Sequence, residues 1–476
     1  MPVHDNHPPG GAAFFQRGVQ SRRKERGFLL VAVLVIVVLA SMVALSLLFR
    51  MRAEEAAFSA SAGSEQAWYA AMSGIQQAIS LAQSKDPALW QNNPGALSRQ
   101  LVLDDGSDKW YFTVFTAGPP EETQARFGLT DESRKLNLNK ATAGMLQKCT
   151  FLSGQQIEAI TGSSTTTNAV SLADPLATSV LFPEAARVHL TTLDDLLKLP
   201  GFTPGVIYGE DANHNFHLDP NEDDGALQFP PDDADGQLFL GLQDVGTVFS
   251  YEFDLSADGS ARFQLNSTNR AIPEGLLSES ASAYLQAAWS NKVIFKTPAE
   301  LLEAKLKVKD ADGKEVEITS GITAKELPLV LDKFTANFDQ RRVGLINVNT
   351  AGSKVLQTIP GVSEAKAEAI AQARENLATD LRDSPAWLYS EGVLSADEFK
   401  MAAPFVTARS GQFRFNVLGY AVPSGRYRVY EVVIDKAPTP NSAPQILYLR
   451  DITKLGLPFA LPSGEDTTDV QPKTQT

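Results

Sequence analysis

The sequence contains one cysteine in 476 residues, Cys149, so no disulfide can form within the chain. A chain of this length can form two or three folding units. Without disulfides, burial of apolar side chains or a bound metal must stabilise them. Cys149 follows Met145 and Leu146 in a helical pattern, which predicts a buried, unreactive thiol.

Positive charge and histidine are both scarce. The chain has 42 Lys and Arg against 56 Asp and Glu, a net charge of −14, which argues against nucleic-acid binding because phosphate contacts need basic side chains. The sequence shows no Gly-x-Ser-x-Gly elbow, phosphate loop or His-Glu-x-x-His. We therefore predict a protein that is not an enzyme and has no catalytic residues. The five histidines are His4, His7, His189, His214 and His217.

One long stretch lacks charge altogether. Residues Phe28 to Phe49 are 22 uncharged residues, which as a helix span about 33 Å, enough for a hydrocarbon core of about 30 Å. The preceding residues 1–27 carry five Lys or Arg and two acids, a net charge of +3. Because basic flanks stay in the cytoplasm, we expect a single-pass anchor with the bulk of the chain on the far side of the membrane.

The junction before this stretch indicates the kind of anchor. A secretory signal has a shorter apolar region followed by a small-x-small cleavage site, whereas here the small residue, Gly27, precedes Phe28. The helical pattern also continues from Phe49 to about Ala82. The run of basic residues, then Gly27 and Phe28, resembles a type IV prepilin leader. That resemblance implies cleavage by a prepilin peptidase after Gly27 and methylation of Phe28. The alternative is an uncleaved signal anchor.

Alternating patterns at both ends of the chain predict antiparallel strands, near 100–117 and again across 412–450. We expect an α+β fold of the pilin type, in which the long N-terminal transmembrane helix packs on this sheet. The intervening residues, about 131–405, have more helical patterns and are predicted to be a large inserted α-helical domain.

The inserted region contains a repeated phrase. Leu136-Asn-Leu-Asn matches Ile346-Asn-Val-Asn, and in both copies an Asn precedes a helix start, where its side chain can cap free backbone N–H groups. The second copy continues through Pro360 and Gly361 into another helical pattern. This part resembles a helix-hairpin-helix unit, so we predict repeats of that kind.

These features divide the chain into six predicted segments. They are a leader (1–27), a transmembrane helix (28–49), a helix continuation with the first strands (50–130), the inserted domain (131–405), the C-terminal strands (406–460) and a disordered tail (461–476).

Taken in order, these features resemble the minor pseudopilin K family of type II secretion systems. Most pilins carry Glu at the fifth mature position, here Ala32, and the pseudopilin K family characteristically lacks it. The resemblance implies a protein of the bacterial inner membrane with its bulk in the periplasm. It further implies that the chain caps the pseudopilus tip with the minor pseudopilins I and J and supports protein export across the outer membrane.

The clearest candidate for a binding site is an acidic loop that begins at Asp211 and ends at Glu222. Its spacing follows an EF-hand-type calcium loop, in which Ca²⁺ takes six to eight hard oxygen ligands. Position six, normally Gly, is Phe216. We predict a Ca²⁺ site outside a true EF-hand pair, whereas the alternative is an acidic surface loop without metal. The predicted ligands are Asp211, Asn213, Asn215, His217 (through its carbonyl oxygen), Asp219 and Glu222.

The helix-hairpin-helix pattern allows a different class of function. Such hairpins commonly hold DNA backbones through main-chain N–H groups, so a membrane-anchored DNA-uptake protein is the alternative. The segment near 355–372 has few basic residues, and the whole chain is acidic. We therefore predict a packing role for the hairpin and no nucleic-acid partner.

Overall fold

A computed structural model of the chain describes residues 23–84, 86–118, 124–162, 187–225, 227–267, 271–273, 275–309, 315–436 and 442–461. Residues 1–22 of the predicted leader and 462–476 of the predicted tail lie outside the described residues. The chain divides into two compact units, 1–65 and 66–476, which are described separately.

The first unit contains most of helix α1 (Arg23–Ala82). From Phe28 onward this helix is long and apolar enough to cross a membrane, and it is the one such helix in the described part of the chain. The large apolar side chains between Phe28 and Phe49 are all exposed to solvent in the isolated chain. This finding agrees with the predicted anchor in length and composition, and α1 ends at Ala82 as its pattern predicted.

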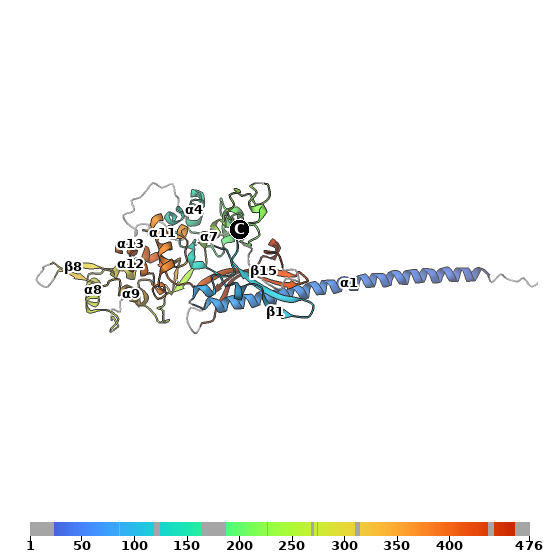
Figure 1. Cartoon of the computed structure of the whole chain (residues 1–476), viewed down its shortest axis with the longest axis horizontal. Coiled ribbons are helices and arrows are strands. Elements are labelled where there is room, and N and C mark those ends of the chain that lie inside the picture. The colour runs from blue at the N-terminus through green and yellow to red at the C-terminus, as the bar shows by residue number, and fades with distance from the viewer. Residues whose placement is uncertain are drawn as a thin grey trace, which may run out of the picture. The chain divides into compact units, whose positions relative to one another are not determined.

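The second unit is built on a six-stranded sheet whose pairings are all antiparallel (Figure 1). The strand order is β1, β2, β14, β15, β16, and β3 pairs with the beginning of β14. The coarse prediction of an α+β fold, with a long apolar N-terminal helix and an antiparallel sheet, is therefore confirmed. The strands are β1 (Gln100–Asp104), β2 (Lys109–Phe115), β3 (Thr130–Asp131), β14 (Gln412–Val422), β15 (Tyr427–Asp435) and β16 (Gln445–Asp451).

Within this unit, the last turns of α1 cover one face of the sheet. Ala71, Ile75 and Ala78 are fully buried there among large side chains of β2, β14 and β15. Small side chains on the helix allow a close approach to the strands. At Gly419 of β14, a Cβ atom would lie 2.2 Å from the carbonyl oxygen of Ala67, so only glycine fits at that position.

The residues between β3 and β14 form short helices and small strand pairs around two further cores. One core joins residues of 136–245 to residues of 346–406 and also includes Ala299, Leu302 and Leu327, and the other lies within 265–334. Serine caps begin several helices, as at Ser153 before α4, Ser363 before α11 and Ser395 before α13. The helices are α3 (Ala143–Leu146), α4 (Gly154–Thr161), α6 (Pro204–Tyr208), α7 (Leu242–Val245), α8 (Glu279–Ser290), α9 (Leu327–Lys333), α10 (Ser353–Leu356), α11 (Glu364–Ala373), α12 (Trp387–Ser390) and α13 (Ala396–Ala402), while α2 (Pro94–Leu97) precedes β1.

Five strand pairs accompany these helices in the described residues. Three are parallel: β4 (Leu136–Asn137) with β5 (Gly246–Thr247), β7 (Phe263–Gln264) with β10 (Phe334–Thr335), and β12 (Ile346–Asn347) with β13 (Val406–Thr407). Two are antiparallel: β6 (Tyr251–Phe253) with β11 (Arg341–Val343), and β8 (Lys305–Lys309) with β9 (Glu315–Thr319).

The predicted apolar role of Cys149 is confirmed. Its side chain is buried in the larger of the two inserted cores, and burial raises the pKa of the thiol to about 11. The thiol therefore stays protonated at neutral pH and packs as a small apolar group.

Candidate functional site

The loop from Asp211 to Glu222 is folded around the oxygen atoms of its own side chains. The Asp211 carboxylate accepts hydrogen bonds from the backbone N–H of Asn215 (3.0 Å) and of Phe216 (3.2 Å). Asn213 Oδ1 also accepts from the Asn215 N–H at 3.0 Å. The chain thus turns tightly around Asp211.

The far end of the loop returns to its beginning through Glu222, which lies in a single turn of 3₁₀ helix at Pro220–Glu222. Its two carboxylate oxygens accept from the N–H of Ala212 (3.1 Å) and of Asp219 (3.2 Å). The amide nitrogens of Asn213 and Asn215 donate to one Asp219 oxygen, at 2.7 and 2.9 Å. Five of the six predicted ligand residues are therefore brought together.

His217, the sixth, contributes its backbone N–H, which donates to Asn215 Oδ1 at 2.7 Å. The role predicted for its carbonyl oxygen stays a prediction. Position six of the loop shows how the sequence departs from the common pattern. Phe216 has a φ of +58°, the left-handed conformation for which glycine is usual.

Packing accounts for a phenylalanine in that conformation. The Phe216 ring lies 6.3 Å from the Phe115 ring, in the apolar cluster on the sheet face opposite α1. Asn416 of β14 donates to the carbonyl oxygen of His214 at 2.8 Å, which fixes the same turn to the sheet. Burial of the phenylalanine ring offsets the backbone strain, so the loop is anchored by residues distant in sequence.

Among the described residues, no Lys or Arg forms an ion pair with the buried carboxylates of this loop. Asp211 and Glu222 are 0% and 1% exposed, and no Lys or Arg occurs between Leu199 and Ala261. Burial, together with the charge of Glu222, raises the pKa of Asp211 to about 8, and burial raises the pKa of Glu222 to about 7. Burial also lowers the pKa of nearby His214, so its imidazole stays neutral and supplies no positive charge.

The predicted ligands are all oxygen atoms, which a hard cation prefers, but they are not arranged around one point as a bound cation requires. Among the described residues, no three His, Cys, Asp or Glu side chains lie close enough together to hold a metal ion. The predicted set contains three carboxylates and relies on amide and carbonyl oxygens for the rest. Its two Asn amide nitrogens face Asp219, so they would have to turn away for the oxygens to face a cation. The Ca²⁺ site stays a prediction.

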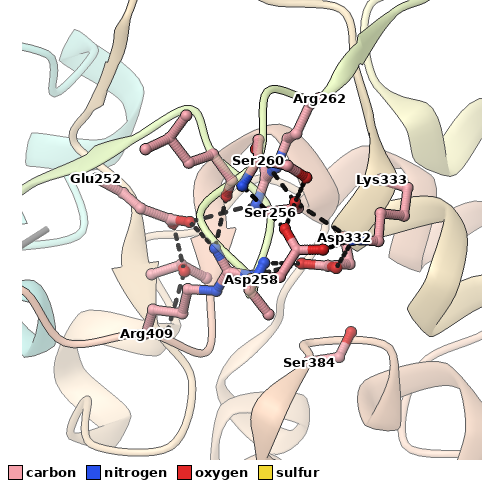
Figure 2. A network of polar contacts seen from close by, with 12 residues as sticks. Glu252, Ser256, Asp258, Ser260, Arg262, Asp332, Lys333, Ser384 and Arg409 are labelled. Carbon is pink, nitrogen blue, oxygen red and sulfur yellow. Dashed lines mark hydrogen bonds and ion pairs between the residues drawn. The ribbon is translucent and has the colours of Figure 1, made fainter. Parts of the chain in front are cut away.

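A second group of carboxylates, whose side chains are 12% (Glu252) and 7% (Asp254) exposed, has the opposite surroundings (Figure 2). Glu252 lies against three guanidinium groups: Arg342 at 2.9 Å, Arg409 at 3.2 Å and Arg262 at 3.5 Å. Asp254 is 3.2 Å from Arg262 and 3.4 Å from Arg342. Burial opposes ionisation of Glu252, but the three arginines outweigh it and lower the pKa of this carboxyl.

The same network contains a serine beside a lysine, the pair that some hydrolases use for nucleophilic attack. Ser256 Oγ lies 3.4 Å from Lys333 Nζ (Figure 2). However, Lys333 donates to Asp258 at 2.5 Å, and this contact raises the pKa of the lysine. A base must be neutral to accept the serine proton, so this pair has the electrostatics of a structural contact.

The sequence did not reveal this network. Glu252 and Arg409 are 157 residues apart in the chain, and no local spacing connects them. The network joins the β6–β11 segment to the residues after β13, because Thr407 Oγ1 also donates to Glu252 at 2.8 Å. It therefore holds neighbouring parts of the region between β3 and β14 together.

The repeated phrases occupy equivalent local structures, and a third segment shares them. Asn137, Gln264 and Asn347 each accept, at 3.0 Å, the N–H of the residue two positions on. Each lies in the first strand of one of the three parallel pairs. Sequence comparison missed the third segment because Gln264 stands where the other two have Asn.

The second strands of the three pairs are also alike. The hydroxyls of Thr247, Thr335 and Thr407 donate to the carboxylates of Glu132, Asp254 and Glu252 respectively. Each of these threonines also accepts the N–H two residues on, at 3.0–3.1 Å.

No protein-family model matches this chain, and no curated protein matches its sequence.

Proposed function

We propose that this chain is a minor pseudopilin of a type II secretion system, which caps the pseudopilus tip and supports protein export across the outer membrane. The observation that carries the proposal is the single helix α1. Its first part is long and apolar enough to span a membrane, and its last turns pack on an antiparallel sheet. A basic leader that ends at Gly27 precedes the apolar part, as in prepilins.

Two further features support a place at the end of a fibre. The fifth residue after Gly27 is Ala32, which cannot supply the carboxylate that pilins are thought to pair with a neighbouring amino terminus. In addition, the two strand groups of the sheet are separated by nearly 280 residues, from β3 to β14. A bulky region at this point would hinder the stacking of another subunit above it.

We propose that this region is an inserted domain built on three copies of one unit, not two. Each copy would begin with an Asn or Gln in a first strand and end with a Thr in a parallel second strand. The first and third of these units in the chain contain the two copies of the phrase found in the sequence. In the last unit, α10 and α11 flank Pro360 and Gly361 as expected for a helix-hairpin-helix, and Gly361 has a φ of +83°.

We further propose that the Asp211–Glu222 loop binds Ca²⁺. Buried carboxylates with raised pKa values and no basic partner support this proposal, because a cation would supply the missing positive charge. Asp211, Asp219 and Glu222 would provide charge, while Asn213, Asn215 and the carbonyl of His217 would complete an all-oxygen set. The chain itself would act without a catalytic site.

The proposed partners follow from the same function: the prepilin peptidase, the minor pseudopilins I and J with the pseudopilus, and the inner membrane. Mass spectrometry of the protein extracted from its own membrane should find an N-terminus at Phe28 carrying one methyl group. A Gly27→Leu variant should keep its leader and fail to support secretion. An intact leader on the native protein would remove the pseudopilin proposal.

DNA uptake is the second candidate. Two of the basic side chains around the proposed hairpin are already engaged, which ranks this function lower. Lys148 binds the carbonyl oxygens of Gln357 and Val362, and Lys366 lies 3.4 Å from Glu398. A gel-shift assay with duplex DNA at physiological salt distinguishes the two functions, because tight binding would reverse the ranking.

A further inference from the structure

A short loop a few residues beyond Glu222 presents two large apolar side chains to solvent. Leu227 and Phe229 are 85% and 76% exposed. Single exposed apolar residues are common on protein surfaces, but these two lie two positions apart on one loop. We call residues 227–231 the apolar finger.

The finger is held by hydrogen bonds at its base. Asp232 donates its N–H to the carbonyl oxygen of Gly225 (2.8 Å), and its carboxylate accepts the Gly225 N–H at 2.7 Å. On the other side, Asn221 Nδ2 donates to the carbonyl oxygen of Phe229 at 3.1 Å. The backbone that presents the two apolar side chains is therefore fixed before any partner binds, and a partner need not supply the ordering.

Strong negative charge surrounds the finger. The segment from Glu210 to Asp235 contains nine acidic residues and no Lys or Arg. Even a bound Ca²⁺ would leave it strongly negative. Asp233 and Asp235, just beyond the finger, are exposed. A bilayer with anionic lipids, or a second copy of this acidic chain, would be repelled from this surface.

We propose that the apolar finger docks into another protein, in an apolar pocket rimmed by Lys and Arg side chains. Leu227 and Phe229 would fill the pocket, and the surrounding acids would pair with its basic rim and speed association. This inference concerns an interaction surface and does not depend on the pseudopilin proposal or on metal binding.

The test uses the full chain in the membrane of its own cells, with a photo-cross-linking phenylalanine analogue in place of Phe229. Phe338 provides a matched control, because it is also 76% exposed but lies outside the acidic segment. We expect position 229, and not position 338, to cross-link to one protein. Mass spectrometry should map the contact to exposed apolar residues flanked by Lys or Arg.

The partner identified in this way is then purified and titrated with the full chain in detergent. Leu227→Ser with Phe229→Ser should raise the dissociation constant by at least about tenfold, because the complex then buries two fewer apolar side chains. Phe338→Ser should change it by less than about twofold. Asp233→Lys with Asp235→Lys should weaken binding at low salt, with a smaller effect at high salt.

The substituted side chains are exposed, so all these variants should melt within a degree or so of the wild type. Cross-linking to lipid or to a second copy of the chain would overturn the proposal. So would equal cross-linking at positions 229 and 338, or no adduct at position 229. A mapped contact surface that is acidic or lacks apolar residues would also overturn it.

Discussion

Two regions of this protein bury carboxylates, and they treat the buried charge in opposite ways. Around Glu252, three arginines lie within 3.5 Å, and they lower the pKa of the carboxyl despite its burial. Around Asp211, the neighbours are backbone N–H groups, amides and another carboxylate, and the pKa rises to about 8. We call these the arginine network and the acidic loop.

The contrast indicates where the chain supplies its own counter-charge for a carboxylate and where it does not. A buried ion is costly unless it is paired, so a self-contained fold either supplies the counter-charge or protonates the acid. The arginine network supplies it from three places in the chain. The acidic loop has two buried carboxyls and no Lys or Arg from residue 199 to residue 261. This difference makes the acidic loop the better candidate for a metal ion.

The largest effect is expected from breaking the arginine network. Glu252→Ala would leave Arg262, Arg342 and Arg409 facing one another without their shared counter-ion. Removing one partner of a buried ion pair costs about 3–5 kcal/mol, so denaturant midpoints of the full chain in detergent should fall accordingly.

The control for this variant is Glu317→Ala, which breaks the exposed Lys305–Glu317 pair (3.3 Å) and should cost less than about 1 kcal/mol. Equal losses in the two variants would contradict the buried role of Glu252.

The next largest effect is expected from Ca²⁺ binding at the acidic loop. Calcium at 100 times its dissociation constant should stabilise the folded chain by about 2.7 kcal/mol, measured as a rise in melting temperature after chelator-treated protein receives Ca²⁺. Asp211→Asn with Glu222→Gln should abolish the rise, whereas Glu317→Gln should keep it in full. If chelator and Ca²⁺ leave the wild-type melting temperature unchanged, the loop does not bind metal.

Local patterns in the sequence were enough to predict much of this arrangement. The helix end at Ala82 and the strands near both ends of the chain depend on neighbours a few residues apart, and such spacings can be read directly. The loop's own contacts, such as Asp211 to the N–H of Asn215, are of this kind.

Two of the features that could not be predicted depend on pairs that are distant in the chain. Phe216 occupies position six, where glycine is usual, and the ring that packs against it, Phe115, is about 100 residues earlier in the chain. Glu252 and Arg409 meet only through the folding of the region between β3 and β14. The third equivalent segment was hidden because Gln264 makes the bond that Asn makes in the other two.

An effect of opposite sign in the two regions should appear with pH. In metal-free protein the raised pKa values of Asp211 and Glu222 mean that the folded state holds protons that the unfolded state has released. The stability contributed by these groups is therefore complete below their ordinary values near 4 and is lost as pH rises toward 8, by about 1.4 kcal/mol per pH unit for each group that is protonated only in the folded state.

The arginine network should behave in reverse. The lowered pKa of Glu252 means that its contribution is present at neutral pH and is lost on acidification below its ordinary value of 4.5. Melting curves of chelated and Ca²⁺-loaded protein from pH 4 to 8 provide the test. The gap between them should widen with pH, because Ca²⁺ binds the deprotonated carboxylates. A constant gap would contradict the coupling of metal and protons in the loop.

The smallest expected change distinguishes the two regions most directly. In metal-free protein at pH 8, Asp211→Asn removes a buried negative charge that has no counter-ion and that Glu222 repels. The substitution also loses one of the two backbone N–H hydrogen bonds that the carboxylate accepts. These terms oppose each other, so the free energy of unfolding should stay within about 1 kcal/mol of the wild type. Glu252→Gln, an equally small change, leaves three arginines with one counter-ion fewer and should destabilise clearly. A large loss in Asp211→Asn without metal would mean that the acidic loop, like the arginine network, is already electrostatically satisfied.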